Sequence, residues 1–265
     1  MKTSESKIKV GILVSYDYPL LAYSLPCIYS YANEIYLAID KKRETWNGNS
    51  FHLPSTFFEW IRAIDKEQKI HFYEDSFYIP SLSPMTLETR TRNMLAKQMG
   101  YNGWHVQIDA DEYFCNFKSF VHALKSWNIN NPVSVYAQWT TLFKQDETGY
   151  FYIKSQEKFP VATNMPYYLY ARIPALERKD LILDEQVIHQ SWARSEGEME
   201  QKLKNWGHTN DFDNNAYLTL WKSINLSNYR KIRNFHPLIP TSWPKLNHIK
   251  AQNIPELIRK LKKKN

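Results

Sequence analysis

Three acidic residues follow an apolar segment in the middle of the chain. The stretch WHVQIDADEYF, residues 104–114, passes directly from strand-like apolar residues to Asp109, Asp111 and Glu112. Alternate residues of an extended segment face the same way, so Asp109 and Asp111 can point at one ligand. Because carboxylates this close repel one another unless a cation lies between them, the pattern predicts a divalent metal ion that binds a diphosphate. The alternative is that both acids are solvated turn residues.

A second Asp-x-Asp sequence, at Asp211 and Asp213, provides an internal comparison. It follows no apolar segment, and the apolar residues after it, between Ala216 and Ile224, recur at helical spacing. Asp213 is therefore predicted to be the N-cap of a helix and not a metal ligand.

His189 lies where a short apolar segment gives way to a loop, just before the capping box Ser195-x-x-Glu198 that predicts a new helix. Its imidazole could complete the metal shell begun by Asp109 and Asp111, and the alternative is a purely structural histidine. A site of mixed carboxylate and imidazole ligands suits Mn²⁺ better than Ca²⁺, which prefers oxygen alone.

Alternating strands and helices must position these side chains. Apolar, β-branched runs predict strands at residues 8–14, 34–40, 70–75 and 104–109, with helices between them after Pro19, at 56–64 and from 84 to about 100. The last three strands end on Asp40, Asp75 and Asp109. The carboxyl ends of parallel strands meet at one edge, so these acids are expected to share a cleft.

The row Arg90, Asn93 and Lys97 follows helical spacing just before the acidic strand. Such a row is ordinarily a solvated helix face. The alternative places Arg90 near the diphosphate, because a guanidinium binds phosphate oxygens well.

The second half departs from strict alternation of strand and helix. A helix is predicted at 117–127, and strands at 133–143, 148–154 and 167–173. We expect this half to cover the cleft and to bind the acceptor of the reaction. The predicted fold is α/β, with a mostly parallel central sheet, helices on both faces and a mixed region in the second half.

Composition is that of a globular chain: 265 residues, 43% hydrophobic, 15% aromatic, with a mean hydropathy of -0.56. No stretch is long enough to cross a bilayer and the start of the chain lacks a cleavage pattern, so a cytoplasmic location is expected. Cys27 and Cys115 lack a metal or redox spacing and are predicted to be reduced, buried thiols.

Five of the net seven positive charges lie in the last seven residues, on Arg259, Lys260, Lys262, Lys263 and Lys264. Together with apolar residues from Ile254 to Leu261, they predict a short basic amphipathic helix. This helix would either dock on anionic lipid, as a peripheral contact at the inner face of the membrane, or pack as an ordinary terminal helix.

Five segments together resemble the GT-A glycosyltransferases, particularly bacterial family 2-like enzymes that build surface polysaccharides. They span roughly residues 7–208 and read VGILVSYDYP, EIYLAID, TRTRNMLAKQMG, VQIDADEYF and IHQSWARSEGEMEQKLKNWGH. The resemblance implies one GT-A domain over 1–265. Its nucleotide-sugar half would be 7–115, its acceptor and metal-completing half 116–212, and its C-terminal helices and tail 213–265.

The resemblance also implies roles for single residues. Asp40 would hold the nucleotide base, Asp75 would lie near the nucleoside, and Asp109 and Asp111 would meet the ribose and the Mn²⁺ or Mg²⁺ ion, with His189 as the later metal ligand. The nucleotide-sugar contacts would further include Arg90, Trp192 and Arg194. One departure is the basic run at 41–43 after Asp40, where the family has a second acid and small residues. For Asp40, a strand-end turn residue is the alternative.

Such an enzyme would move a sugar from a UDP- or GDP-sugar to a saccharide or lipid-linked acceptor, with inversion. An ion across both phosphates stabilises the leaving group, and a carboxylate takes the proton of the acceptor hydroxyl. Glu185 is the preferred base, followed by Asp184, then Asp146 and Glu147.

Three other functions compete with this one. A nucleotidyltransferase needs a glycine-rich loop after the first strand, and residues 15–22 contain no glycine. A nucleic-acid-binding protein would interleave basic and aromatic residues along a strand, which this chain does not, so no nucleic-acid partner is expected. An inactive sugar-binding relative would keep the fold without turnover.

Overall fold

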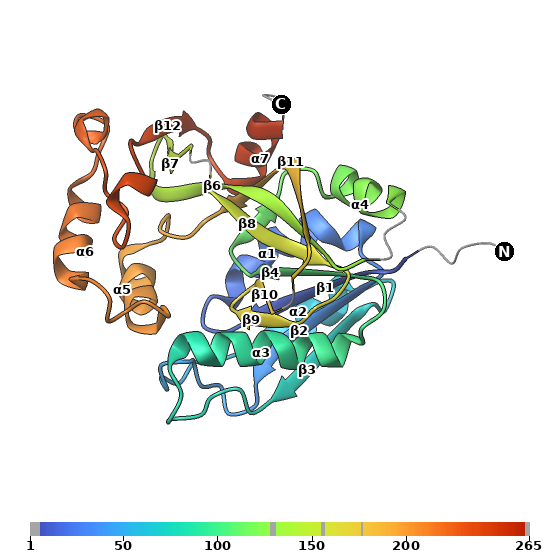
Figure 1. The fold of residues 1–265 in the computed structure, drawn as a ribbon. Coiled ribbons are helices and arrows are strands. Elements are labelled where there is room, and N and C mark those ends of the chain that lie inside the picture. Colours follow the sequence, from blue (N-terminus) through green and yellow to red (C-terminus); the bar gives the residue numbers. More distant parts are fainter. Residues whose placement is uncertain (1–5, 128–130, 155–156, 176, 263–265) are drawn as a thin grey trace.

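Four parallel strands form one side of the large sheet in the computed structural model, which describes residues 6–127, 131–154, 157–175 and 177–262 (Figure 1). They are β1 (Ile8–Val14), β2 (Glu34–Asp40), β3 (Ile70–Asp75) and β4 (Trp104–Asp109), in the order β4-β1-β2-β3. All four match the predicted ranges. β1 is almost fully buried along its length, as expected of a parallel strand covered on both faces.

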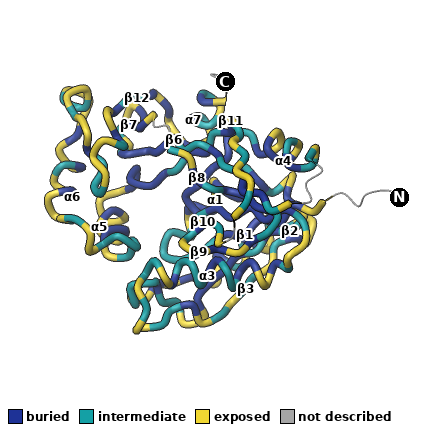
Figure 2. The backbone as a smooth tube through the Cα atoms, in the orientation of Figure 1, coloured by how far each residue is buried: buried dark blue, intermediate teal, exposed yellow. Residues whose placement is uncertain are grey.

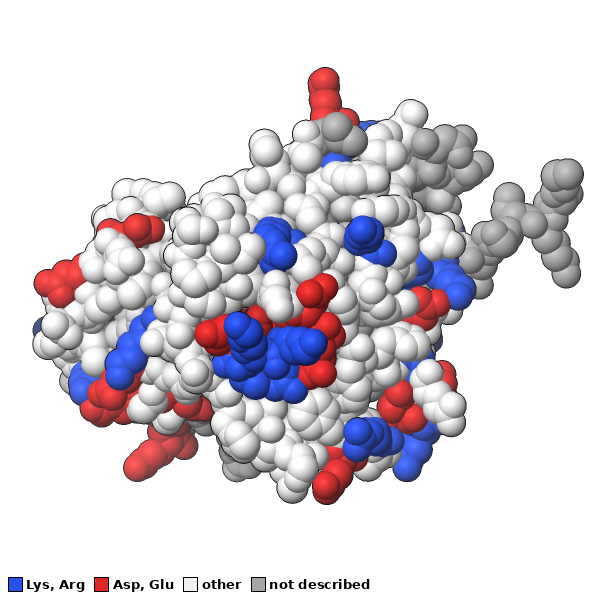
Figure 3. Space-filling view, turned by 90° about the horizontal axis from the view of Figure 1, so that it is seen from below, with Lys and Arg blue, Asp and Glu red and all other residues white. Residues whose placement is uncertain are grey.

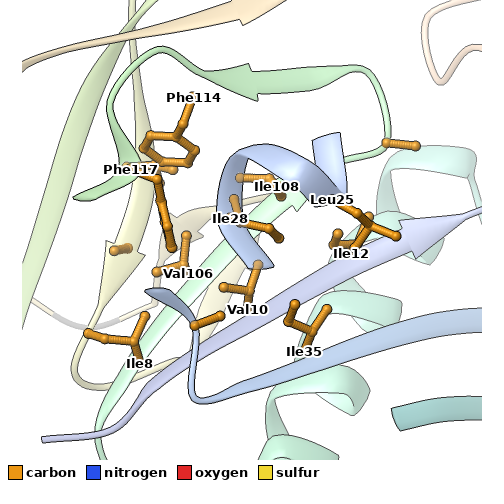
Figure 4. Packing of buried hydrophobic residues seen from close by; sticks show 14 of the residues in the cluster. Ile8, Val10, Ile12, Leu25, Ile28, Ile35, Val106, Ile108, Phe114 and Phe117 are labelled. Atoms are coloured by element: carbon orange, nitrogen blue, oxygen red, sulfur yellow. The ribbon is translucent and has the colours of Figure 1, made fainter. Parts of the chain in front are cut away.

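Helices cover the two faces of these strands, and the alternation of side chains along β1 explains how. Val10 and Ile12 pack with Leu25 and Ile28 of α1 (Leu21–Ile28) (Figure 4). On the opposite face, a Cβ atom placed on Gly11 would lie 2.8 Å from Leu95 Cδ2 of α3 (Pro84–Met99). The small residue therefore lets α3 approach the sheet closely.

The remaining helices before β6 are two α-helices and two 3₁₀ turns. They are α2 (Ser55–Ile64), α4 (Phe117–Ser126) and the 3₁₀ turns η1 (Tyr18–Leu20) and η2 (Tyr29–Tyr31). Helix starts follow the predicted capping chemistry: the Ser83 side chain accepts a hydrogen bond from Thr86 N at the start of α3. Asp213 likewise accepts bonds from Asn215 N and Ala216 N, which confirms it as an N-cap.

The second half extends the same sheet with mostly antiparallel pairings, although β11 runs parallel to β6. The full order is β12-β7-β6-β8-β4-β1-β2-β3, and β11 pairs with both β6 and β5, making ten strands. The added strands are β5 (Glu112–Phe114), β6 (Val133–Asp146), β7 (Gly149–Ile153), β8 (Lys158–Thr163), β11 (Lys179–His189) and β12 (Asn247–Lys250). A separate hairpin pairs β9 (Tyr168–Tyr170) with β10 (Ile173–Pro174). The predicted α/β fold with a mixed second half is confirmed.

Some strands escaped prediction for identifiable reasons. β5 has three residues, and β8 contains Pro160, which ordinarily argues against an inner strand. β11 begins at Lys179 with alternating exposed residues, so only its last, buried part reads as apolar. The strand expected at 167–173 is instead the β9–β10 hairpin.

An aromatic core packs against two of the three last α-helices of the chain, α5 (Glu196–Asn205) and α6 (Asn214–Ser223). The third is α7 (Ile254–Lys262), which follows the 3₁₀ turns η3 (Tyr229–Lys231) and η4 (Pro240–Ser242). Phe143 of β6, Trp192 and Trp221 of α6 belong to this core, apart from the cluster around the parallel strands. Figure 2 shows buried segments in both regions.

The basic helix α7 packs its apolar side into the protein. Ile254, Leu257 and Leu261 are buried beside Ile249 of β12, so the apolar face predicted as a lipid contact is covered by the chain itself. Lys263 and Lys264 lie outside the described residues. Among the helices that are described, none combines the length and the apolar character needed to span a membrane.

Gly149 allows β7 and β12 to lie close together, so a larger residue at this position should destabilise the protein. A Cβ atom at this position would lie 2.8 Å from Lys250 Cα, a backbone atom that cannot move aside. We expect Gly149→Ala to lower the free energy of unfolding by about 1–3 kcal/mol, measured by urea denaturation. Gly197→Ala, in the exposed first turn of α5 with nothing within 4 Å, is the control and should not destabilise the protein. Equal stability of both variants would contradict this account.

Candidate active site

A cavity of about 500 Å³ opens at the carboxyl ends of β1, β2 and β4. Its walls include Asp17 after β1, Asp40 of β2 and Asp109 of β4, while the second half contributes Trp139 and His189. Because β1 lies between β4 and β2, the strand order reverses there, and α/β sheets bind ligands at such a point. The cavity therefore lies at the predicted edge, where Asp40 and Asp109 line it but Asp75 does not.

Asp109 is held between two arginines. Its Oδ1 lies 2.9 Å from Arg92 Nη2, and its Oδ2 lies 2.6 Å from Arg172 Nη2. Burial alone would raise the pKa of Asp109, but Arg172 and Arg92 together outweigh it and keep the pKa below its usual value. The side chain retains 35% of its accessible surface, so this fixed, charged carboxylate faces the cavity.

Arg172 also neutralises a second acid. Its two Nη atoms each lie 3.0 Å from an oxygen of Glu112, whose carboxylate further accepts bonds from Trp139 Nε1 and Asp109 N. Arg172 follows Ala171 at the turn of the β9–β10 hairpin, where Ala171 has a φ of 47°. Thr89 Oγ1 of α3 accepts a bond from Ala171 N, so helix and hairpin together direct the arginine inward.

Asp111 contacts a different set of basic groups. Its Oδ2 lies 2.6 Å from Arg194 Nη2 and 3.7 Å from His189 Nε2. The proximity of His189 follows from strand pairing, because β11 runs antiparallel to β5 with His189 opposite Glu112. Gln190 N also donates to Asp111 O, so His189 and Asp111 are held together by the backbone.

A divalent ion fits part of this arrangement. The two guanidiniums beside Asp109 repel a cation at that carboxylate, and no group of three or more His, Cys, Asp or Glu side chains that could hold an ion occurs within the described residues. Asp111 and His189 fit as a pair. Burial lowers the pKa of His189 to about 4, which keeps its ring in the neutral form that ligates metals. Mg²⁺-type sites commonly use one or two protein groups plus phosphate oxygens and water.

Three of the expected nucleotide contacts bind other parts of the protein. Asp40 lines the cavity, but its oxygens accept bonds from backbone amides of residues 42, 44, 77 and 78, which is the turn-residue alternative. Arg90 donates to the carbonyl oxygens of Ser76 and Phe77 and does not line the cavity. Asp75, which accepts bonds from Tyr73 Oη and Ser76 N, does not line it either.

The residues expected as the catalytic base lie away from the cavity. Glu185 Oε1 accepts a bond from Asn116 N at the start of α4, and burial raises its pKa to about 7. Neither Glu185 nor its neighbour Asp184 is among the lining residues. The cause is the course of β11, which is longer than expected and has an irregularity between Ile182 and Gln186.

Trp192 and Arg194 do reach the site. Trp192 lines the cavity as part of the aromatic core. Arg194, besides its contact with Asp111, lies 3.5 Å from Asp17 Oδ2, so it joins the loop after β1 to the acidic turn after β4. Its guanidinium is thus occupied by protein carboxylates.

Several residues of the cavity were missed from the sequence. They are Asp17, Trp139, Glu157, Arg172 and Lys202, together with Arg92, which does not line the cavity but pairs with Asp109. Only Lys202 carried a usable signal: it lies three residues after Met199 and next to Leu203, on the apolar stripe of α5, where a lysine must be buried. The others are isolated polar or aromatic residues whose neighbours in space are distant in the chain.

No family model matches this chain, and no curated protein matches it. Among solved structures, the chain is similar to the crystal structure of TarS from S. aureus, residues 1–349, with a TM-score of 0.44 and 12% sequence identity. The match covers 84% of this chain and 76% of that chain. The assignment of a function therefore depends on the chemistry of the cavity.

Loss of the Arg172 ion pairs should destabilise the protein. Arg172→Gln would leave Glu112 and Asp109 without a shared cation in a buried site, and we expect a loss of about 3–5 kcal/mol in the free energy of unfolding. Arg62→Gln, on the exposed surface of α2, is the matched control and should change it little. Adding Glu112→Gln to Arg172→Gln should recover part of the loss, and full additivity would argue against the pairing.

Proposed function

We propose that this protein is a glycosyltransferase that moves a sugar from a nucleoside diphosphate to an acceptor hydroxyl. The observation that carries the proposal is the placement of Asp111 beside His189 in a cavity at the carboxyl ends of parallel strands. A carboxylate and a neutral imidazole, with several cations around them, suit a ligand that combines a diphosphate with a divalent ion.

In this proposal Asp111 and His189 hold Mn²⁺ or Mg²⁺. When bound, the ion supplies Lewis-acid stabilisation of the leaving diphosphate. Asp109, fixed by Arg92 and Arg172, takes the other role expected of it and accepts hydrogen bonds from ribose or sugar hydroxyls. Because the two arginines hold its orientation, little rotamer entropy is lost when such hydroxyls bind.

The nucleoside is best accommodated on the first-half wall of the cavity. Trp46 and Phe77 line it there, and aromatic faces stack on bases. Since the Asp40 carboxylate is occupied by backbone amides, we infer that it shapes this wall instead of reading the base directly. UDP- and GDP-sugars remain the expected donors.

The acceptor is best accommodated on the second-half wall. Trp139, Phe159 and Trp243 line it, and flat aromatic rings pack well against sugar rings. Trp139 stacks on Phe159 with ring centroids 4.3 Å apart, which makes a rigid platform. The expected acceptor is a saccharide, free or lipid-linked; a peripheral membrane contact would use the basic residues of α7 and not its buried apolar side.

Glu157 replaces Glu185 as the proposed catalytic base. It lines the acceptor wall and accepts a bond from Trp243 Nε1 at 3.5 Å. Burial raises the pKa of Glu157, whereas the guanidiniums beside Asp109 lower the pKa of that carboxyl. A carboxylate with a raised pKa is the better proton acceptor for a sugar hydroxyl in an inverting transfer.

The nucleic-acid-binding alternative finds less support. On the face shown in Figure 3, the largest group of lysines and arginines is bordered by acidic side chains and does not extend into a continuous basic surface. Phosphate-backbone binding needs an extended basic surface of that kind.

Nucleotide binding should require Asp111. In thermal-shift measurements with Mn²⁺, UDP or GDP at a hundredfold over its Kd should add about 2.7 kcal/mol of stability, and Asp111→Asn should abolish the metal-dependent response. Asp213→Asn, in the second Asp-x-Asp sequence, is the control and should respond like the parent, because Asp213 caps α6. Indifference of the parent protein to every nucleoside diphosphate would refute the proposed function.

The two candidate bases can be separated by substitution. With the donor that gives the largest thermal shift, Glu157→Gln should lower kcat by about 10²- to 10⁴-fold while the nucleotide Kd is unchanged. Glu185→Gln should retain kcat, because Glu185 lies outside the cavity at the start of α4. The reverse outcome would return the role to Glu185.

A further inference from the structure

Lys202 is a buried cation at the edge of the cavity. It belongs to α5, retains only 7% of its accessible surface, and is one of the residues that line the cavity. Its Nζ lies 4.0 Å from Asp111 Oδ2 and 5.7 Å from the centre of the Trp192 ring. The nearest carboxylate oxygen is therefore beyond hydrogen-bonding distance, and that oxygen already binds Arg194 at 2.6 Å.

Other buried or half-buried lysines that the structure describes do have hydrogen-bond acceptors. Lys69 Nζ donates to Glu67 Oε2 at 3.1 Å. Lys9 Nζ donates to Met99 O, Gly100 O and Asn102 Oδ1, at 2.6, 2.9 and 2.5 Å. Lys144 Nζ donates to three carbonyl oxygens, those of residues 221, 222 and 224, at 2.7–3.0 Å. Lys202 makes no such bond to any of the residues that the structure describes.

The lack of a hydrogen-bond acceptor for Lys202 costs free energy. A buried ammonium loses its hydration, and proteins ordinarily compensate with hydrogen bonds or a close ion pair. An ammonium group that faces a cavity without a close acceptor can bind an anionic group of the ligand.

We propose that Lys202 binds the diphosphate of the donor and stabilises it as the leaving group. This rests on the proposed glycosyl transfer. As the bond between the anomeric carbon and the diphosphate oxygen breaks, its electron pair moves onto that oxygen. The acceptor oxygen forms the new bond to the anomeric carbon and gives its proton to the base. Lys202 lies on the same side of the cavity as Asp111 and His189, where the negative charge develops, and an ammonium there lowers its free energy.

A graded series of ligands tests this contact. The dissociation constants of uridine, UMP and UDP, and of the matching guanosine compounds, are measured by calorimetry with Mn²⁺ present. Lys202→Met keeps an unbranched apolar side chain but removes the charge, and it should weaken diphosphate binding about 10- to 100-fold. Nucleoside binding should stay unchanged, and Lys202→Arg should recover part of the diphosphate affinity.

Lys204→Met is the matched control, because Lys204 lies two residues after Lys202, on the exposed side of α5. It should bind all the ligands like the parent. Thermal unfolding without ligand checks that each variant folds, and if Lys202→Met does not fold, Lys202→Gln takes its place.

The outcomes separate the two proposals. If the parent binds diphosphates and the Lys202 variants lose nucleoside and diphosphate affinity equally, or lose neither, the role of Lys202 is overturned while glycosyl transfer stands. If the parent binds no nucleotide at all, both proposals fail.

Discussion

The neutralisation of four crowded carboxylates by buried cations is the constraint on which the rest of the site depends. Asp109 and Glu112 share Arg172, while Asp17 and Asp111 share Arg194. Without these guanidiniums, charges this close in a poorly hydrated cavity would repel one another or become protonated. The arginines help to keep the pKa values of Asp109 and Asp111 below their usual range, whereas burial raises the pKa of Asp17 and raises that of Glu112 to about 7.

The same ion pairs connect parts of the chain that no local interaction would join. Arg172 brings the β9–β10 hairpin against the end of β4, and Arg194 brings the segment before α5 against the loop after β1. The second half thereby closes the cavity that the parallel strands open. Strand pairing does the rest, since β11 meets β5 in a register that sets His189 next to the acidic turn.

The charged and polar groups of this site differ in whether other protein groups already bind them. Asp109 has both oxygens occupied, whereas His189 is neutral and Lys202 faces the cavity without a close acceptor. A ligand that carries both negative charge and a divalent ion complements the second pair. This division of roles between the two acids of one Asp-x-Asp sequence is a consequence of the arginine positions and not of the acids themselves.

The sequence by itself determined the parallel strands, the helix caps and the edge of the sheet at which the acids gather. Apolar runs, capping boxes and the end of β4 at Asp109 are local patterns, and backbone geometry converts them directly into structure. Only the tertiary structure decided which groups meet there. Arg172 and Arg194 lie 63 and 83 residues from the acids they pair with, Glu185 is directed away by an irregularity in β11, and Asp40 is occupied by backbone amides. Long-range contacts of this kind depend on strand register and hairpin geometry, which leave no periodic signal in the chain.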